Sequence, residues 1–237
     1  MITFVVPCYN ASVNLNFLYA SLKMQSNDNW RVIFVDDVSN DNDTRDILKK
    51  IAFLDTKRVT VVLNEEKKYA LRNIVETVSN KNLVADDDIV AIIDGDDSLC
   101  NENTVSLLNK EFSVDEVSVV WTAHRWDVNN LNISRDLPKG INPYQYEWCS
   151  SHLKSFRASA LRAISIENFK DANGQWFQRG YDQALMLPLL YVAKARVYVP
   201  VVCYNYNINS TSLPQRDWSE RKQLSTINFV RARGFLR

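Results

Sequence analysis

The chain has 237 residues, and its 28 lysine and arginine residues balance 28 aspartate and glutamate residues, so the formal net charge is zero. This balance excludes the global basic field that attracts nucleic acids or anionic membranes, and we expect no nucleic-acid partner. The most apolar later segment, residues 184–193, is far shorter than the roughly 20 residues that cross a bilayer, so no membrane span is predicted. Four widely spaced cysteines without a C-x-x-C pair indicate reduced thiols in a cytoplasmic protein.

Strand-like and helical segments alternate along the first half of the chain. Five nearly continuous β-branched or aromatic runs have the pattern of strands covered on both faces in a parallel sheet, and apolar residues at helical spacing separate them. The strands are expected at residues 2–6, 31–35, 58–63, 89–93 and 117–123, and the helices around 15–22, 43–53, 67–79 and 103–111. This order predicts an α/β fold with a mostly parallel sheet flanked by helices.

Polar clusters follow three of these strands. They are "PCYN" (residues 7–10), "DD" (residues 36–37) and "DGDD" (residues 94–97). Because functional groups in such folds gather at the carboxyl ends of the strands, we expect the three clusters to meet at one edge of the sheet. Each of the first two clusters alone is equally compatible with an ordinary turn or a helix cap.

The "DGDD" cluster favours a divalent-cation site. Asp94, Asp96 and Asp97 repel one another unless positive charge lies between them. Mg²⁺ or Mn²⁺ prefers one or two carboxylates with substrate phosphates completing its coordination shell. A nucleoside diphosphate fits this demand.

The motifs, taken together, resemble those of family 2 glycosyltransferases of the GT-A fold. The chain has "VVPCYN", "VDDVSND", "ALRN" (residues 70–73) and "DGDD" in the order typical of that family, although "ALRN" departs from the usual A-R-N. The resemblance implies a GT-A fold and a nucleoside diphosphate sugar as donor, with UDP the commonest nucleotide. It also implies a binding set for that donor: Pro7, Tyr9, Asn10, Asp36, Asp37, Arg72, Asn73, Asp94, Gly95, Asp96 and Asp97.

The resemblance also suggests a role for each part of this set. Pro7 and Tyr9, with Asp36 or Asp37, would hold the base and ribose, and Arg72 would approach the nucleotide or its phosphates. Of the "DGDD" turn, Asp94 and Asp96 would face the ribose and the metal, and Asp97 would assist at the donor sugar.

Motifs in the second half resemble a bacterial and viral subset of the family. They are "HLKSF" (152–156), "DQALMLP" (182–188) and "YNYN" (204–207). Asp182 occupies the position of the family's catalytic base, which deprotonates a hydroxyl of a glycan or other acceptor and so inverts the stereochemistry. Tyr181 and Tyr191 stand where relatives often have acids. A cytoplasmic protein of a bacterium or a virus-infected cell is implied.

Several side chains of the second half carry open interpretations. His152 is as compatible with packing as with a metal or diphosphate contact. His124 is interpreted as a structural residue or as part of the wall of the acceptor site. Trp148, Trp176 and Phe177 suit either the core or an acceptor sugar. Helical spacing around residues 153–163 predicts that Lys154 and Arg157 share an exposed helix face, with phosphate binding as the alternative.

We expect a single domain over residues 1–237 with three parts. Residues 1–123 form a nucleotide-sugar-binding half, 124–204 an acceptor and catalytic-base half, and 205–237 a C-terminal tail or lid. A dehalogenase-like phosphatase is disfavoured because three strands precede its would-be motif. A nucleotidyltransferase remains an alternative despite the missing Gly-rich loop, and so does a non-catalytic sugar-nucleotide-binding module.

Overall fold

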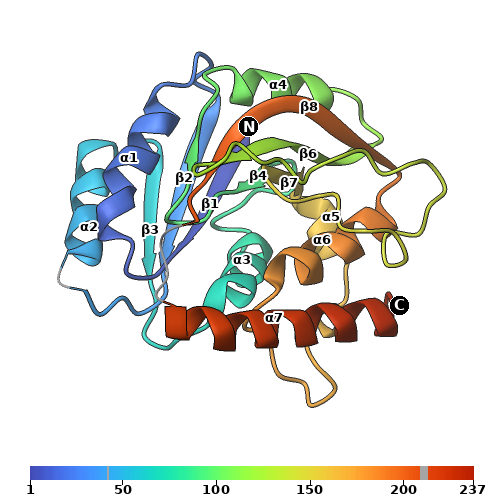
Figure 1. Cartoon of the computed structure of the whole chain (residues 1–237). Helices are drawn as coiled ribbons and strands as arrows, with labels where there is room; N and C mark the ends of the chain where they lie inside the picture. The colour runs from blue at the N-terminus through green and yellow to red at the C-terminus, as the bar shows by residue number, and fades with distance from the viewer. Residues whose placement is uncertain (42, 209–212) are drawn as a thin grey trace.

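A computed structural model describes the backbone of residues 1–41, 43–208 and 213–237 and the side chains of all of these except 213–218. Its strands form one sheet in the order β3-β2-β1-β4-β7-β6-β8-β5 (Figure 1). Their bounds are β1 Ile2–Cys8, β2 Trp30–Asp36, β3 Val59–Leu63, β4 Ile89–Ile92, β5 Ser98–Leu99, β6 Val117–Trp126, β7 Lys154–Arg157 and β8 Ala195–Tyr206. The five expected strands are confirmed.

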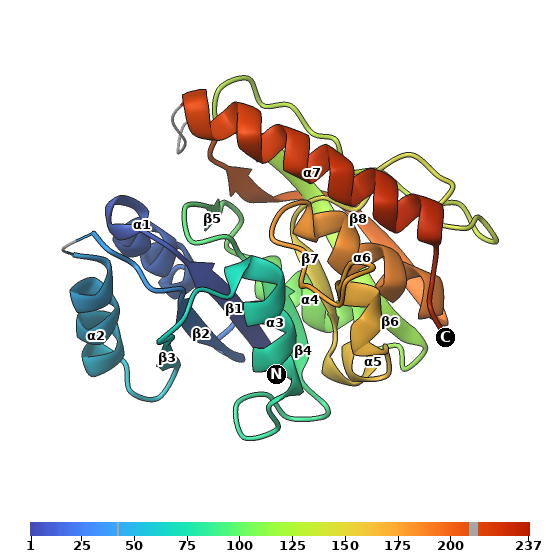
Figure 2. The same ribbon diagram turned by 90° about the horizontal axis from the view of Figure 1, so that it is seen from below.

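Helices cover both faces of this sheet (Figure 2). One face packs against α1, α2 and α4, and the other against α3, α5 and α6, so the described residues form two apolar cores in a three-layer domain. The helices are α1 Ser12–Lys23, α2 Thr44–Leu54, α3 Tyr69–Ser79, α4 Thr104–Glu111, α5 Ala158–Arg162, α6 Tyr181–Val192 and α7 Leu213–Arg233, with a 3₁₀ helix, η1, at Ile166–Phe169. None of the described helices is long and apolar enough to span a membrane.

Strand β7 corrects the expected helix around residues 153–163. Lys154–Arg157 pairs antiparallel with β4 on one side and β6 on the other, and only residues 158–162 are helical. Lys154 and Arg157 therefore share no exposed helix face. Lys154 is fully buried, and the guanidinium of Arg157 donates to the backbone oxygens of Val117 and Phe112. Hydrogen bonding on both edges of the strand outweighs the local helical spacing.

The last segment contains a packed helix. Figure 1 shows α7 running beneath α3 and α6, and its Val230 is buried in the core. Arg231 ties it to α6 by donating to the side-chain oxygen of Gln183 at 2.7 Å. Residues 209–212 of the predicted tail or lid lie outside the described residues. The lid role stays a prediction.

Candidate functional site

The carboxyl ends of β1, β2 and β4 meet at one edge of the sheet. Parallel pairing places Cys8 opposite Asp36, and β4 on the other side of β1. The turn after β4 packs directly against the end of β1, because a side chain at Gly95 would put its Cβ 3.0 Å from the Pro7 carbonyl oxygen. Only glycine permits this approach. The three polar clusters are therefore neighbours, as expected.

The two acids after β2 are both held by the protein. Asp36 is fully buried and accepts from Nε of Arg45 at 2.7 Å. Asp37 accepts the backbone N–H groups of Lys68 and Tyr69, at 2.7 and 2.9 Å, and so satisfies donors at the first turn of α3. These contacts give both carboxylates a structural role. Nucleotide binding by either acid stays a prediction.

The amide of Asn64 extends this arrangement into α3. Its nitrogen donates to Asp37 at 3.2 Å and to the side-chain oxygen of Asn73 at 2.7 Å. Arg72, the neighbour of Asn73, instead faces acids of its own region. Its guanidinium lies 2.6 Å from Glu76 and 3.2 Å from Glu66, and the hydrogen bond that it donates to Glu76 is the main reason that its pKa is raised. Among the described residues, no ion pair joins Arg72 to the strand-end aspartates.

An exposed aromatic ring and a lysine stand at the rim of this edge. The Tyr9 side chain is half exposed, and the Lys67 ammonium lies 2.6 Å from the centre of its ring. Lys67 also lies 3.7 Å from Asp37. Asn10 next to Tyr9 has a positive φ of 50° and exchanges two hydrogen bonds with Asn40. A cation beside an open ring suits the phosphate and base of a nucleotide.

The aspartate turn, residues 94–97, is anchored to β8 by Asp97. The buried Asp97 carboxylate accepts from the Tyr204 hydroxyl at 2.6 Å and from the Asn207 backbone N–H at 2.8 Å. Burial and the charges of Asp94 and Asp96 raise its pKa well above the ordinary value. Asp96, by contrast, is partly exposed, and none of the described residues donates a hydrogen bond to its carboxylate. Asp96 is thus the acid best placed to take a new partner.

Asp182 reaches the aspartate turn through two intermediate side chains. It lies in the first turn of α6, and its Oδ1 lies 2.6 Å from the buried ammonium of Lys154. That ammonium also donates to the Tyr181 hydroxyl at 3.3 Å, and the Tyr181 hydroxyl donates to Asp94. Burial, with the charges of Asp182 and Asp96, raises the pKa of Asp94 to about 6 against the opposing charge of Lys154. Residues almost 90 positions apart therefore form one charged network.

The acids of the turn fit a divalent cation better than His152 does. Ligand atoms of Asp94, Asp97 and His152 lie within 4.8 Å of one another. However, Nδ1 of His152 is 3.1 Å from the Lys154 ammonium, which can only donate. A neutral imidazole accepting there carries its proton on Nε2, so metal binding by His152 requires that this hydrogen bond be given up. The carboxylates suit Mn²⁺ or Mg²⁺ without such a change.

His152 is also a packing residue. Its ring stacks on Tyr204 and Tyr206, with centroids 4.6 and 5.0 Å away, and meets the buried ring of His124 edge to face. Burial, followed by the charge of Lys154, lowers its pKa well below the ordinary value. Burial likewise lowers the pKa of His124, to about 4.

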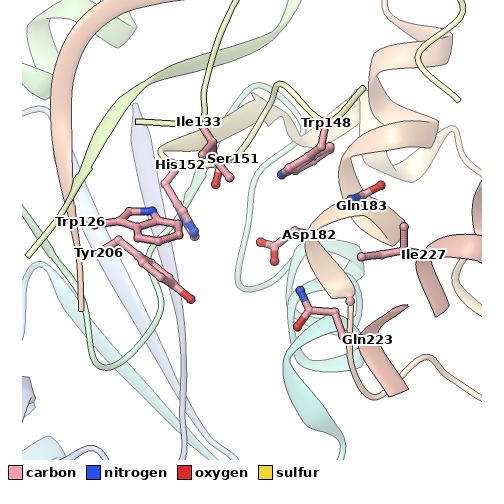
Figure 3. Close-up of a pocket in the computed structure, with 11 residues that line it drawn as sticks. Trp126, Ile133, Trp148, Ser151, His152, Asp182, Gln183, Tyr206, Gln223 and Ile227 are labelled. Atoms are coloured by element: carbon pink, nitrogen blue, oxygen red, sulfur yellow. The ribbon is translucent and has the colours of Figure 1, made fainter. Parts of the chain in front are cut away.

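A pocket of about 180 Å³ opens beside Asp182 (Figure 3). Its walls come from the end of β6, the connection to β7, the start of α6, the end of β8 and α7. The described lining residues are Trp126, Ile133, Trp148, Ser151, His152, Gly180, Asp182, Gln183, Tyr206, Gln223 and Ile227. A carboxylate, two side-chain amides and several aromatic rings thus line one space.

Comparison with protein families identifies the chain. The family model described as "Glycosyl transferase family 2" matches residues 3–167, well over half of the sequence. The chain belongs to glycosyl transferase family 2. No curated protein was found to match it.

Solved structures share the fold of this family 2 protein. TarS (residues 1–349) from S. aureus has a TM-score of 0.64 at 17% identity, covering 97% of this chain and 64% of its own. A complex of the same protein with UDP-GlcNAc has a TM-score of 0.64 at 18% identity, covering 89% and 59%. The mannosyltransferase PcManGT from Pyrobaculum calidifontis, in complex with GDP-Man and Mn²⁺, has a TM-score of 0.65 at 16% identity, covering 95% and 63%. The expected GT-A-type α/β fold is confirmed, and the chain spans less than two thirds of these proteins.

Sequence reasoning missed several residues that shape the site of this family 2 protein. Tyr204 was noted only as part of a motif, yet it anchors Asp97 and stacks on His152. Lys67, whose ammonium lies on the Tyr9 ring, belongs to none of the motifs. Gln223 of α7, which lines the pocket, lies in the segment predicted as a tail. The signal for Lys154 was present, since a lysine flanked by the apolar Leu153 and Phe156 needs an acid when buried.

Proposed function

We propose that the protein is an inverting glycosyltransferase, which moves a sugar from a nucleoside diphosphate sugar to a hydroxyl group of a glycan or other acceptor. One observation carries this proposal. Asp182 and Asp94, far apart in the sequence, are joined through Lys154 and Tyr181, and Asp182 lines a pocket. A base for the acceptor and an acidic turn for a diphosphate are what direct displacement requires.

The donor is assigned to the strand ends. Tyr9 and Lys67 offer a ring and a cation for the nucleotide, and the aspartate turn would hold Mn²⁺ or Mg²⁺ through Asp94 and Asp96. Such an ion supplies positive charge to the departing diphosphate. UDP is favoured as the nucleotide, in keeping with the UDP-GlcNAc bound by TarS, while the GDP-Man bound by PcManGT is the main competitor.

The protein's own residues then perform the transfer. Lys154 fixes Oδ1 of Asp182, which leaves the second carboxylate oxygen to accept the proton of an acceptor hydroxyl. That hydroxyl attacks the anomeric carbon from the face opposite the leaving diphosphate, so the configuration inverts.

All four cysteines are free, which accords with a reducing cytoplasm.

A thermal-shift panel tests the donor assignment. UDP, GDP, CDP and dTDP sugars are added with and without Mn²⁺, and one nucleotide class should raise the melting temperature in a metal-dependent way. Asp96→Ala should remove the metal-dependent part, whereas Asp46→Ala, on the exposed surface of α2, should not. Stabilisation by none of the donors would overturn the proposal.

Turnover tests the base assignment. Asp182→Asn should keep the donor-dependent thermal shift and lose nucleoside diphosphate release by about 100-fold or more, because a general base contributes roughly that much. Release at the wild-type rate would show that another group removes the proton. A wild-type protein that binds donor but never releases nucleoside diphosphate would be a non-catalytic binding module.

A further inference from the structure

The pocket beside Asp182 has the chemistry of a site for a single sugar ring. Its volume of about 180 Å³ suits a ligand of the size of one sugar ring. Trp126 and Tyr206 form one wall, with ring centroids 6.1 Å apart, and Trp148 faces them across the space (Figure 3). All three rings are only partly buried. Aromatic faces pack against the C–H face of a sugar.

The remaining wall comes from α7. Gln223 and Ile227 occupy one face of this helix, one turn apart, and both line the pocket. The position of α7 is fixed close to Asp182, because the backbone oxygen of Gln223 lies 3.1 Å from where a Cβ at Gly180 would be. An amide that both donates and accepts can pair with sugar hydroxyls. The helix that carries this amide therefore lies at the catalytic end of α6.

The charge of the pocket narrows the ligand class. Among the described lining residues, Asp182 supplies the one carboxylate, and none is a lysine or arginine. The Lys154 ammonium lies 3.1 Å from Nδ1 of His152 and can only donate, so this ring acts as an acceptor there. A phosphate or carboxylate group would be buried here without a lysine or arginine of the lining to pair with its charge. An uncharged sugar needs no such partner.

We propose that this pocket is the acceptor subsite, that it takes one uncharged sugar ring between Trp148 and the Trp126–Tyr206 pair, and that Gln223 of α7 selects the acceptor through its hydroxyls. The proposal rests on the proposed glycosyl transfer, and it adds the acceptor class and the residues that choose it. The acceptor is thus a neutral glycoside rather than an anionic one.

The test measures nucleoside diphosphate release from the donor that stabilises the wild type best. Methyl hexopyranosides serve as neutral acceptor probes, and their 6-phosphates as anionic ones. A neutral glycoside should raise release above the rate of donor hydrolysis, and its 6-phosphate should be at least tenfold less effective. A faster reaction with the phosphate, or no stimulation by any neutral glycoside while donor is hydrolysed, would overturn the inference.

Variants separate the acceptor from the donor. Trp148→Ala and Gln223→Ala should each raise the acceptor KM about tenfold or more and leave the donor KM within twofold. Trp176→Ala is the matched control, because that ring stacks on Phe169 outside the pocket. Gln223 is exposed, so we expect Gln223→Ala to fold, and it gives an acceptor KM even where Trp148→Ala folds poorly. A rise in the donor KM alone would assign the pocket to the donor sugar instead.

Failure of the broader proposal has a different signature. A wild-type protein that is stabilised by no nucleotide sugar and hydrolyses none contradicts glycosyl transfer itself. A protein that hydrolyses donor and ignores neutral glycosides contradicts only the acceptor assignment.

Discussion

Lys154 is the residue around which the site is organised. It is fully buried, and its ammonium contacts Asp182, His152 and Tyr181 at 2.6 to 3.3 Å. A buried charge is tolerated only where opposite charge and hydrogen-bond partners surround it. Lys154 is therefore the standing counter-charge of the carboxylates, present before any metal or donor binds.

Removing the positive charge of Lys154 should destabilise the protein more than the accompanying change in side-chain volume does. Lys154→Met keeps a chain of similar length but leaves the Asp182 carboxylate, which is 27% exposed, without its partner, and we expect a loss of about 1–3 kcal/mol in the free energy of unfolding. Lys154→Met combined with Asp182→Asn should recover part of that loss, since neither charge remains. Urea unfolding of the three proteins measures both effects.

A matched pair elsewhere calibrates the result. Arg31 lies 2.5 Å from the buried Asp88 at the opposite end of the sheet. Arg31→Met should also destabilise the protein, but donor-dependent thermal shifts should be unchanged. Equal stability of Lys154→Met and wild type would mean that the pair contributes nothing to folding.

Residue chemistry was easier to predict than residue contacts. The acids after β2 and β4 were found in the sequence because carboxylates at strand ends are conspicuous. Nothing local indicates that Asp37 receives the first N–H groups of α3, since those groups lie about 30 positions further along the chain. Such contacts arise only when the sheet brings the ends of β2 and β3 together.

At the scale of elements, the sequence pattern predicts the strands of the first half and the helix α6 of the second half, but it does not predict strands β7 and β8. Strands β1 to β4 are regular apolar runs, so pattern and structure agree. Strand β7 has only four residues and pairs on both edges, so its identity is set by β4 and β6 rather than by its own spacing. Strand β8 contains Pro200, and its pairing with β6 includes register shifts, which hide its alternation.

The junction of α6 and α7 depends on Gly180. Its φ of 68° is disfavoured for other residues, and an added Cβ would meet Gln223 and Thr226 of α7 at 3.1 and 3.3 Å. Gly180→Ala should lower the free energy of unfolding by about 1–2 kcal/mol from the backbone alone, with a further loss from the contact. It should also displace Gln223 and raise the acceptor KM.

Gly174 provides the control for this junction. It has a similar φ of 73°, yet an added Cβ would meet nothing within 4 Å. Gly174→Ala should therefore show the backbone cost alone, and the difference between the two melting temperatures measures the packing of α7 on α6. Equal effects of the two substitutions would indicate that α7 shifts to accommodate the added Cβ without a loss of stability.

For the whole molecule, acid stability reflects two opposing sets of buried groups. Burial, followed by the charge of Lys154, lowers the pKa of His124 to about 4, and burial likewise lowers that of His152. Below pH 6.5, the ordinary pKa of histidine, these rings bind protons in the unfolded chain but not in the folded one. The free energy of unfolding therefore falls as the pH drops. Asp94 acts in the opposite direction, because burial raises its pKa to about 6 and the folded state then binds the extra proton.

Replacing one histidine isolates its share of this balance. Relative to pH 7.5, His124 alone should cost the wild type about 2 kcal/mol at pH 5, from a shift between about 6.5 and about 4. His124→Gln cannot take up that proton in either state, so its urea midpoint should fall less between pH 7.5 and 5 than that of the wild type. The carboxylate contribution is common to both proteins and cancels in the difference. Parallel loss of stability in the two proteins would mean that His124 titrates alike in the folded and unfolded chains.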